Sequence, residues 1–164
     1  MGVYGQSAYP YPWYMPPHYW WPGSPPRVPQ PQPALRDRGR TPYVVNIAQA
    51  ARQNRNFRTA LWTGEHFQVT LMSIPVGEDI GLEVHPTTDQ FVRIEEGQGL
   101  VQMGPSRDRL EFRQMAYPGS AVMIPAGTWH NITNTGNRPL KVYAIYAPPE
   151  HPFGTIHPTK PEEE

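Results

Sequence analysis

Hydrophobic and polar residues alternate along most of this chain from residue 57 onward, in runs too short for ordinary helices. The clearest run spans 66–74, where Phe67, Val69 and Leu71 would face one side and the residues between them the other. A period of two is typical of a half-buried β-strand. Similar short runs, bounded by Gly, Pro, Asn or Asp, predict further strands at 43–46, 57–62, 82–85, 91–95, 100–103, 110–115, 121–124, 130–134 and 139–147. The pattern therefore predicts an all-β sandwich or barrel.

One short helix interrupts the predicted strands. Asn46 precedes the alanine-rich segment 47–52, and its side chain can accept a hydrogen bond from the first free amides of a helix. We expect a helical turn there and almost no other helix.

The first 35 residues differ sharply from the rest, with ten prolines among many Tyr and Trp residues. Prolines lack the amide hydrogens that helices and sheets need, so we expect a disordered tail. Two interpretations stay open: a solvated, variable tail, or aromatic residues that bind one another or an assembly. The predicted organisation is a tail and linker over 1–40, a barrel over 41–150, and an extended C-terminal tail over 151–164.

Composition narrows the classes of partner. The 164 residues carry 14 basic and 14 acidic side chains, so net charge provides no case for binding nucleic acid or an anionic membrane. The absence of cysteine excludes disulfides and thiolate metal sites. The N-terminus has no secretory-signal pattern, and no apolar run approaches the roughly 20 residues of a membrane span. We expect a soluble, cytoplasmic protein.

The most informative stretch is 119–134. Its strand-like run 121–124 leads to a turn containing Pro125 and Gly127, and a second strand opens on His130. Such a turn presents one imidazole from a rigid scaffold, as metal sites require.

A second polar cluster lies upstream, between Gly77 and Gly97. Glu83 and His85 are two residues apart on a predicted strand, so both side chains leave the same face about 6 to 7 Å apart at the backbone. Gln90 follows after a short turn, on the adjacent predicted strand.

Together these stretches resemble the two signatures of the cupin superfamily. The second signature, glycine-x5-Pro-x-Gly-x2-His-x3-Asn, is complete in 119–134. In the first, Glu83 stands where the family has a histidine, His85 matches, and Gln90 replaces a glutamate. The resemblance covers roughly residues 60–147, and the chain also looks like small single-domain bacterial cupins. It implies a cupin jelly-roll β-barrel.

The resemblance also implies a metal site. Glu83, His85, Gln90 and His130 would bind a divalent transition metal: Fe, Mn, Zn or Ni. The usual cupin site holds three histidines and a glutamate, so Glu83 keeps the ligand charge at −1 although Gln90 is neutral. The alternative is that these four side chains form only a hydrogen-bonded polar network.

Three hypotheses for function follow. The first is a metal-dependent small-molecule enzyme of oxygenase type, in which Glu83 could also act as a catalytic base. The second is a sugar-phosphate isomerase similar to mannose-6-phosphate isomerases, which are cupins. The third is a non-catalytic structural or binding module, attached through its aromatic tail to an assembly such as a spore coat. A small-molecule ligand is expected, and a homodimer is left open.

Other side chains carry weaker predictions. Arg93, Gln68 and Tyr143 are lesser candidates for substrate contact. Surface or hairpin pairing suits Arg93 and Gln68 better, and core packing suits Tyr143 better. Asp89 is expected to cap a turn and Trp129 to pack outside the pocket. His66, His151 and His157 are not expected to be ligands, and the segment around His157 could fold over the mouth of the barrel.

Overall fold

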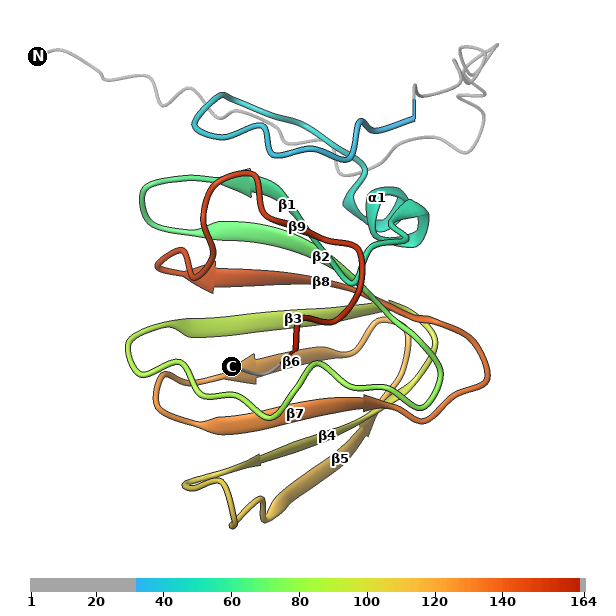
Figure 1. The fold of residues 1–164 in the computed structure, drawn as a ribbon, viewed down its shortest axis with the longest axis vertical. Coiled ribbons are helices and arrows are strands. Elements are labelled where there is room, and N and C mark those ends of the chain that lie inside the picture. Colours follow the sequence, from blue (N-terminus) through green and yellow to red (C-terminus); the bar gives the residue numbers. More distant parts are fainter. Residues whose placement is uncertain (1–31, 163–164) are drawn as a thin grey trace, which may run out of the picture. The chain divides into compact units, whose positions relative to one another are not determined.

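The computed structural model describes residues 32–162 (Figure 1). One helix and nine strands occur in this range: α1 (Ile47–Gln53), β1 (Arg58–Thr63), β2 (Gln68–Ile74), β3 (Asp89–Glu96), β4 (Gly99–Gly104), β5 (Phe112–Ala116), β6 (Ala121–Ile124), β7 (Trp129–Asn134), β8 (Leu140–Ala147) and β9 (Ile156–His157). The all-β class predicted from the alternation is confirmed. The predicted N-terminal tail lies outside the described residues as far as residue 31.

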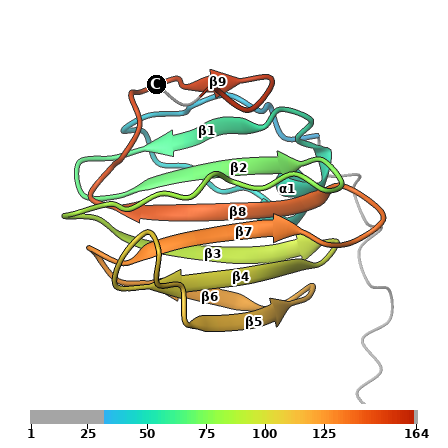
Figure 2. The same ribbon diagram turned by 60° about the horizontal axis from the view of Figure 1, so that its bottom comes forward.

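The strands form two antiparallel sheets (Figures 1 and 2). One has six strands in the order β6-β3-β8-β2-β1-β9, and the other has three in the order β5-β4-β7. Buried apolar side chains of both sheets make a single core, with Met72, Ile94 and Val142 from the larger sheet and Val101 and Ile132 from the smaller. Burying one such side chain typically stabilises a fold by about 1.5–3 kcal/mol. The interior between the sheets is therefore closed by packing.

A second, smaller core lies between α1 and the six-stranded sheet. Ala50 and Ala51 of the helix pack there with Leu61 and Leu71, and all four are fully or almost fully buried. The predicted alternation of β2 is confirmed, because Leu71 packs in this cluster while Met72 packs in the core between the sheets. As predicted, Asn46 caps the helix by accepting a hydrogen bond from the Gln49 amide at 3.0 Å.

Two predicted strands do not form. Residues 43–46 are irregular, with Tyr43 and Val45 packed against the α1 core. Residues 82–85 lie in the β2–β3 connection, residues 75–88, which pairs with β7 only through two isolated bridges, at Asp79 and at Glu83. Between those bridges Gly81 has a φ of 91°, a conformation that bends the segment out of strand geometry.

Both ends of the described chain are attached to the barrel. In the predicted linker, the Asp37 carboxylate accepts hydrogen bonds from the Thr63 hydroxyl at 2.5 Å and the Gly154 amide at 3.0 Å. In the predicted C-terminal tail, β9 pairs with β1. The alternation did not predict β9, because two residues are too few to show a period. No helix among residues 32–162 is long and apolar enough to cross a membrane.

Candidate metal centre

The site is built on one pair of backbone-bonded residues. The Glu83 amide donates to the His130 carbonyl at 3.0 Å, and the His130 amide donates to the Glu83 carbonyl at 2.9 Å. Residues that exchange both hydrogen bonds in an antiparallel pair project their side chains to the same side, with Cα atoms about 5.5 Å apart. This single bridge therefore places a carboxylate beside an imidazole from a strand some 47 residues further along the chain.

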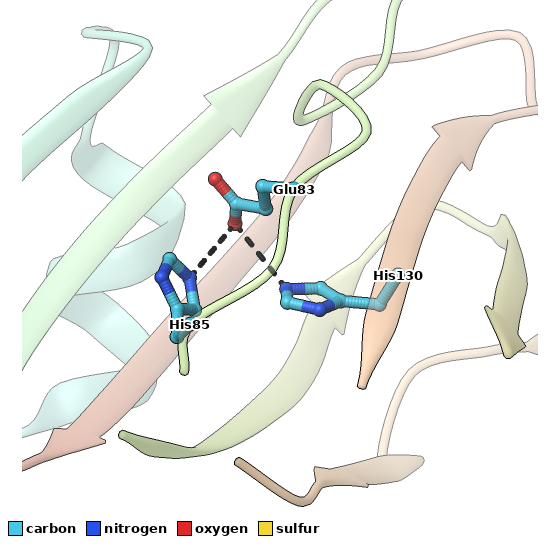
Figure 3. Close-up of side chains that lie close together, drawn as sticks. All are labelled: Glu83, His85 and His130. Atoms are coloured by element: carbon cyan, nitrogen blue, oxygen red, sulfur yellow. Dashed lines mark ion pairs between the residues drawn. The ribbon is translucent and has the colours of Figure 1, made fainter. Parts of the chain in front are cut away.

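His85 joins this pair from the same connection. The Gly127 amide donates to the His85 carbonyl at 2.8 Å, which fixes the turn before β7 against the His85 backbone. The three side chains point toward one another (Figure 3). Oε1 of Glu83 lies 3.4 Å from Nε2 of His85 and 3.4 Å from Nε2 of His130.

The three ligand atoms fit a single transition-metal ion. They all lie within 4.8 Å of one another, and each is buried with no hydrogen-bond partner in the described part of the chain. Contacts of 3.4 Å are long for an N–H···O hydrogen bond, which is usually near 2.9–3.0 Å. Two atoms each about 2.0–2.2 Å from one ion are separated by roughly 3.0–3.5 Å. The spacing thus suits ligands better than members of a closed hydrogen-bonded network.

Each imidazole is oriented through its other nitrogen. Nδ1 of His130 lies 2.8 Å from the Thr128 carbonyl oxygen, and Nδ1 of His85 lies 3.1 Å from a carboxylate oxygen of Glu150. An acceptor at Nδ1 holds the proton there and leaves the Nε2 lone pair directed at the centre. When neutral, both histidines are therefore oriented for the tautomer that a metal ligand needs.

The charges of the three groups reinforce one another. Burial by itself would raise the pKa of the Glu83 carboxyl, but polar contacts with His130 and His85 outweigh it and lower that pKa to about 2. Burial by itself would lower the pKa of His85, but Glu83, and next Glu150, raise it. Glu83 is therefore ionised throughout the physiological range and supplies one negative charge to the centre.

Gln90 lies on the inner face of the six-stranded sheet. It is 3% exposed on β3, opposite Tyr146 of β8, and its side-chain oxygen has no hydrogen-bond partner among residues 32–162. Directly opposed residues share a face of the sheet. The ring of Tyr146 in turn lies 5.6 Å from that of His85. That Gln90 is a fourth ligand stays a prediction.

The weaker candidates have contacts that lie outside the group of three ligand atoms. Tyr143 packs in the core beneath α1, and Arg93 pairs with Glu95 at 3.1 Å. Asp89 caps the turn before β7 by accepting from the Ala126 amide at 2.8 Å. Gln68 is fully buried; it pairs with Thr63 across the β1–β2 hairpin, as expected, and also bonds to the backbone of His151. The ligand group does not include His66, His151 or His157.

A cavity of about 400 Å³ opens onto the Glu83 side chain. Its wall includes Arg58, Arg107 and Lys160, none of which the sequence patterns marked. Trp129 also lines it, with the Arg107 guanidinium 6.0 Å from the centre of the indole, while the alternation along β7 separates Trp129 from the buried His130, as expected. Residues 160–162 contribute to the cavity, as expected if the C-terminal segment folds toward the barrel mouth.

Fold and site together define a cupin, and the chain belongs to the cupin superfamily: the family described as "Cupin domain" matches residues 70–146. The chain is 65% identical over 126 residues to the uncharacterized protein YrkC of Bacillus subtilis (strain 168), covering 77% of this chain and 68% of that protein. It is 40% identical over 121 residues to the uncharacterized protein L612 of Acanthamoeba polyphaga mimivirus, covering 73% and 74%. The crystal structure of BH2720 from Bacillus halodurans matches with a TM-score of 0.76 and 63% identity, covering 77% of this chain and 96% of that one.

Proposed function

We propose that this protein is a metal-dependent enzyme of oxygenase type that acts on a small organic molecule. One observation carries the proposal: the carboxylate oxygen of Glu83 and the Nε2 atoms of His85 and His130 converge, buried and without other partners. Two imidazoles and one carboxylate are the donor set typical of non-haem iron(II) oxygenases, and the same set also accepts Mn, Zn or Ni.

The bound metal would supply Lewis acidity and a site for oxygen activation. The surrounding residues have separate tasks. His85 and His130 are held by Glu150 and Thr128 so that their lone pairs face the centre. Glu83 lines the cavity with 25% of its side chain exposed, so a substrate entering there would meet it. A carboxylate whose pKa is about 2 is a weak base, which favours the ligand role of Glu83 over the role of catalytic base.

The test measures two things: how much metal the protein retains, and whether the bound metal has an open coordination position. We expect the purified chain, loaded anaerobically with iron(II), to retain about one ion per chain. Alanine substitutions of Glu83, His85 and His130 should each remove it. His66→Ala, an exposed histidine outside the site, is the matched control and should keep it. Nitric oxide added to the loaded protein should give an iron–nitrosyl electron paramagnetic resonance signal. A wild-type protein that retains no metal would refute the proposal.

A sugar-phosphate isomerase is the second candidate. Arg107 and Lys160 at the cavity favour it, because they are cations near the site. Against it, the Lys160 ammonium is hydrogen-bonded to Asp79. Isomerisation of mannose 6-phosphate by the metal-loaded protein, without oxygen uptake, would support this alternative over an oxygenase.

A non-catalytic module is the third candidate. Its support is the composition of the N-terminal segment, which lies outside the described residues up to residue 31. Deleting residues 1–35 should abolish attachment to an assembly such as a spore coat and leave the barrel folded. A full-length protein that is not found in any assembly would contradict this candidate.

A further inference from the structure

A second set of buried polar groups lies on the inner face of the six-stranded sheet. Arg58 of β1 is opposite Met72 of β2, and Thr70 and Met72 are two residues apart on β2. Gln68, two residues before Thr70, is opposite Tyr146 of β8. Since paired residues share a face and alternate residues return to it, Arg58, Thr70 and Tyr146 project to the same side.

All three side chains are buried, and Arg58 lacks a counter-ion. Arg58 is 5% exposed, while Thr70 and Tyr146 are fully buried. Within residues 32–162, Nε of Arg58 has no hydrogen-bond partner, and the Tyr146 hydroxyl has its polar contacts with Thr70 and Arg58, within the same set. The Arg58 guanidinium has no carboxylate within ion-pair distance in this part of the chain, and its one recorded side-chain hydrogen bond is to Nδ1 of His157 at 3.4 Å.

Such an arrangement is expensive unless something binds there. A buried cation without a counter-ion costs free energy, and hydroxyls that contact that cation do not neutralise its charge. Burial raises the pKa of Tyr146 to about 12, so its hydroxyl keeps its proton and can donate. Arg58, Thr70 and Tyr146 therefore present several donors and one positive charge, which is what an anion requires.

This donor set is next to the metal centre. Arg58 and Glu83 line the same cavity of about 400 Å³. The ring of Tyr146 lies 5.6 Å from that of His85, edge to face. A ligand held by Arg58 in this cavity would therefore have its remaining atoms beside Glu83.

We propose that Arg58, positioned by its contact with the Tyr146 hydroxyl, binds the carboxylate of a small organic acid and holds it next to the metal centre. The guanidinium fork matches the two oxygens of one carboxylate. As a statement about the substrate, this inference rests on the proposed function. As a statement about binding, it depends only on Arg58 and its neighbours.

A carboxylate fits better than a phosphate. The anionic Glu83 lines the same cavity and would repel a dianion more strongly than a monoanion. Lys160, the lysine in the cavity wall, is already paired with Asp79. Arg107, the other arginine of the wall, is exposed to solvent, so Arg58 is the buried cation of this cavity and balances one negative charge.

The test uses the full chain with three probes: acetate, its neutral isostere acetamide, and inorganic phosphate. Binding is followed by saturation-transfer NMR in metal-free protein, so that a probe cannot bind through the ion. We expect saturable binding of acetate, none of acetamide, and weaker binding of phosphate. Arg58→Gln should weaken acetate binding about tenfold or more, and Tyr146→Phe should weaken it by a smaller factor. Arg113→Gln, an exposed arginine on β5, should leave it unchanged.

A thermal-shift measurement separates binding from a purely structural role. If Arg58 is present for an anion, Arg58→Met should melt at or above the wild-type temperature without acetate, because it removes an uncompensated buried charge. Acetate should raise the melting temperature of the wild type and leave that of Arg58→Met unchanged. A destabilised Arg58→Met that still binds acetate normally would overturn the inference.

Failure of this inference is distinguishable from failure of the proposed function. If acetate binding depends on Arg58 but the protein never retains metal, the carboxylate site is supported and the proposed oxygenase function is refuted. If the protein retains metal but acetate binding does not depend on Arg58, the metal centre is supported and the carboxylate site is refuted. Phosphate binding tighter than acetate overturns the carboxylate class.

Discussion

At the scale of single residues, Glu150 shows how a side chain outside the ligand set can control the centre. Its carboxylate lies 3.1 Å from Nδ1 of His85, whereas Glu83 lies 3.4 Å from Nε2 on the other edge of the ring. Glu150 follows the last long strand, in a segment without any periodic pattern. Sequence reasoning missed it, because only folding brings it to His85.

Removing this carboxylate should weaken metal binding. We expect Glu150→Ala to lower metal affinity by about 10- to 100-fold, because His85 loses the acceptor that fixes its tautomer and ring orientation. Glu150→Gln should lose less, since its amide oxygen can still accept. Competition with a chelator measures the affinities. Glu65→Ala, an exposed residue in the turn between β1 and β2, is the control, and equal affinities for Glu150→Ala and wild type would contradict the prediction.

At the scale of elements, the site depends on how β4 and β7 pair. Gly104, the last residue of β4, is opposite Trp129, which directly precedes His130 on β7. A methyl group at Gly104 would lie 1.6 Å from the Arg109 carbonyl oxygen, a backbone atom that cannot move alone. This glycine therefore allows the β4–β5 loop to close against the end of β4.

Gly104→Ala should disturb this whole corner of the three-stranded sheet. We expect a loss of more than about 3 kcal/mol in the free energy of unfolding, measured by urea denaturation, and weaker metal binding through displacement of β7. Gly136→Ala is the matched control, because its nearest contact would be Cγ of the Gln98 side chain at 3.2 Å, which can move. Gly136→Ala should lower the free energy of unfolding by no more than about 1 kcal/mol. Equal losses for the two variants would contradict the prediction that the contact between Gly104 and the Arg109 carbonyl excludes a side chain.

At the scale of the whole molecule, the C-terminal segment adds a half-buried histidine to the fold. The ring of His151 lies 5.0 Å from that of Tyr146, edge to face, and Gln68 bonds to its backbone. Burial, and next the charge of Arg58, lower the pKa of His151 to about 4 from an ordinary value of 6.5. The folded protein therefore favours the neutral imidazole.

Stability should consequently fall in mild acid. Between pH 6.5 and 4 the imidazole of His151 binds a proton in the unfolded chain and not in the folded chain. The free energy of unfolding therefore decreases as the pH falls through this range. Below about pH 4 both states bind the proton, so the contribution of His151 levels off. We expect about 1–3 kcal/mol from His151. His151→Phe should show a smaller decrease over this range in urea denaturation, whereas the exposed-site variant His66→Ala should behave as wild type. An unchanged pH profile in His151→Phe would refute the assignment.

Most strands could be predicted because their signal is local. Alternation and turn residues located β2, β6 and β8 to within about two residues, and Asn46 marked the start of α1. The segment 82–85 was wrongly predicted as a strand, because a strand requires a partner along its length and Gly81 limits the pairing to single bridges.

The sequence by itself determined the fold family, the two motifs, and the candidate ligands Glu83, His85 and His130. These properties depend on spacing within short stretches, where backbone geometry directs each side chain. Only the tertiary structure decided that Arg58, Tyr146 and Glu150 surround those ligands. The reason is physical: they come from β1, β8 and the segment after it, and the register between strands distant in sequence depends on packing of the entire barrel.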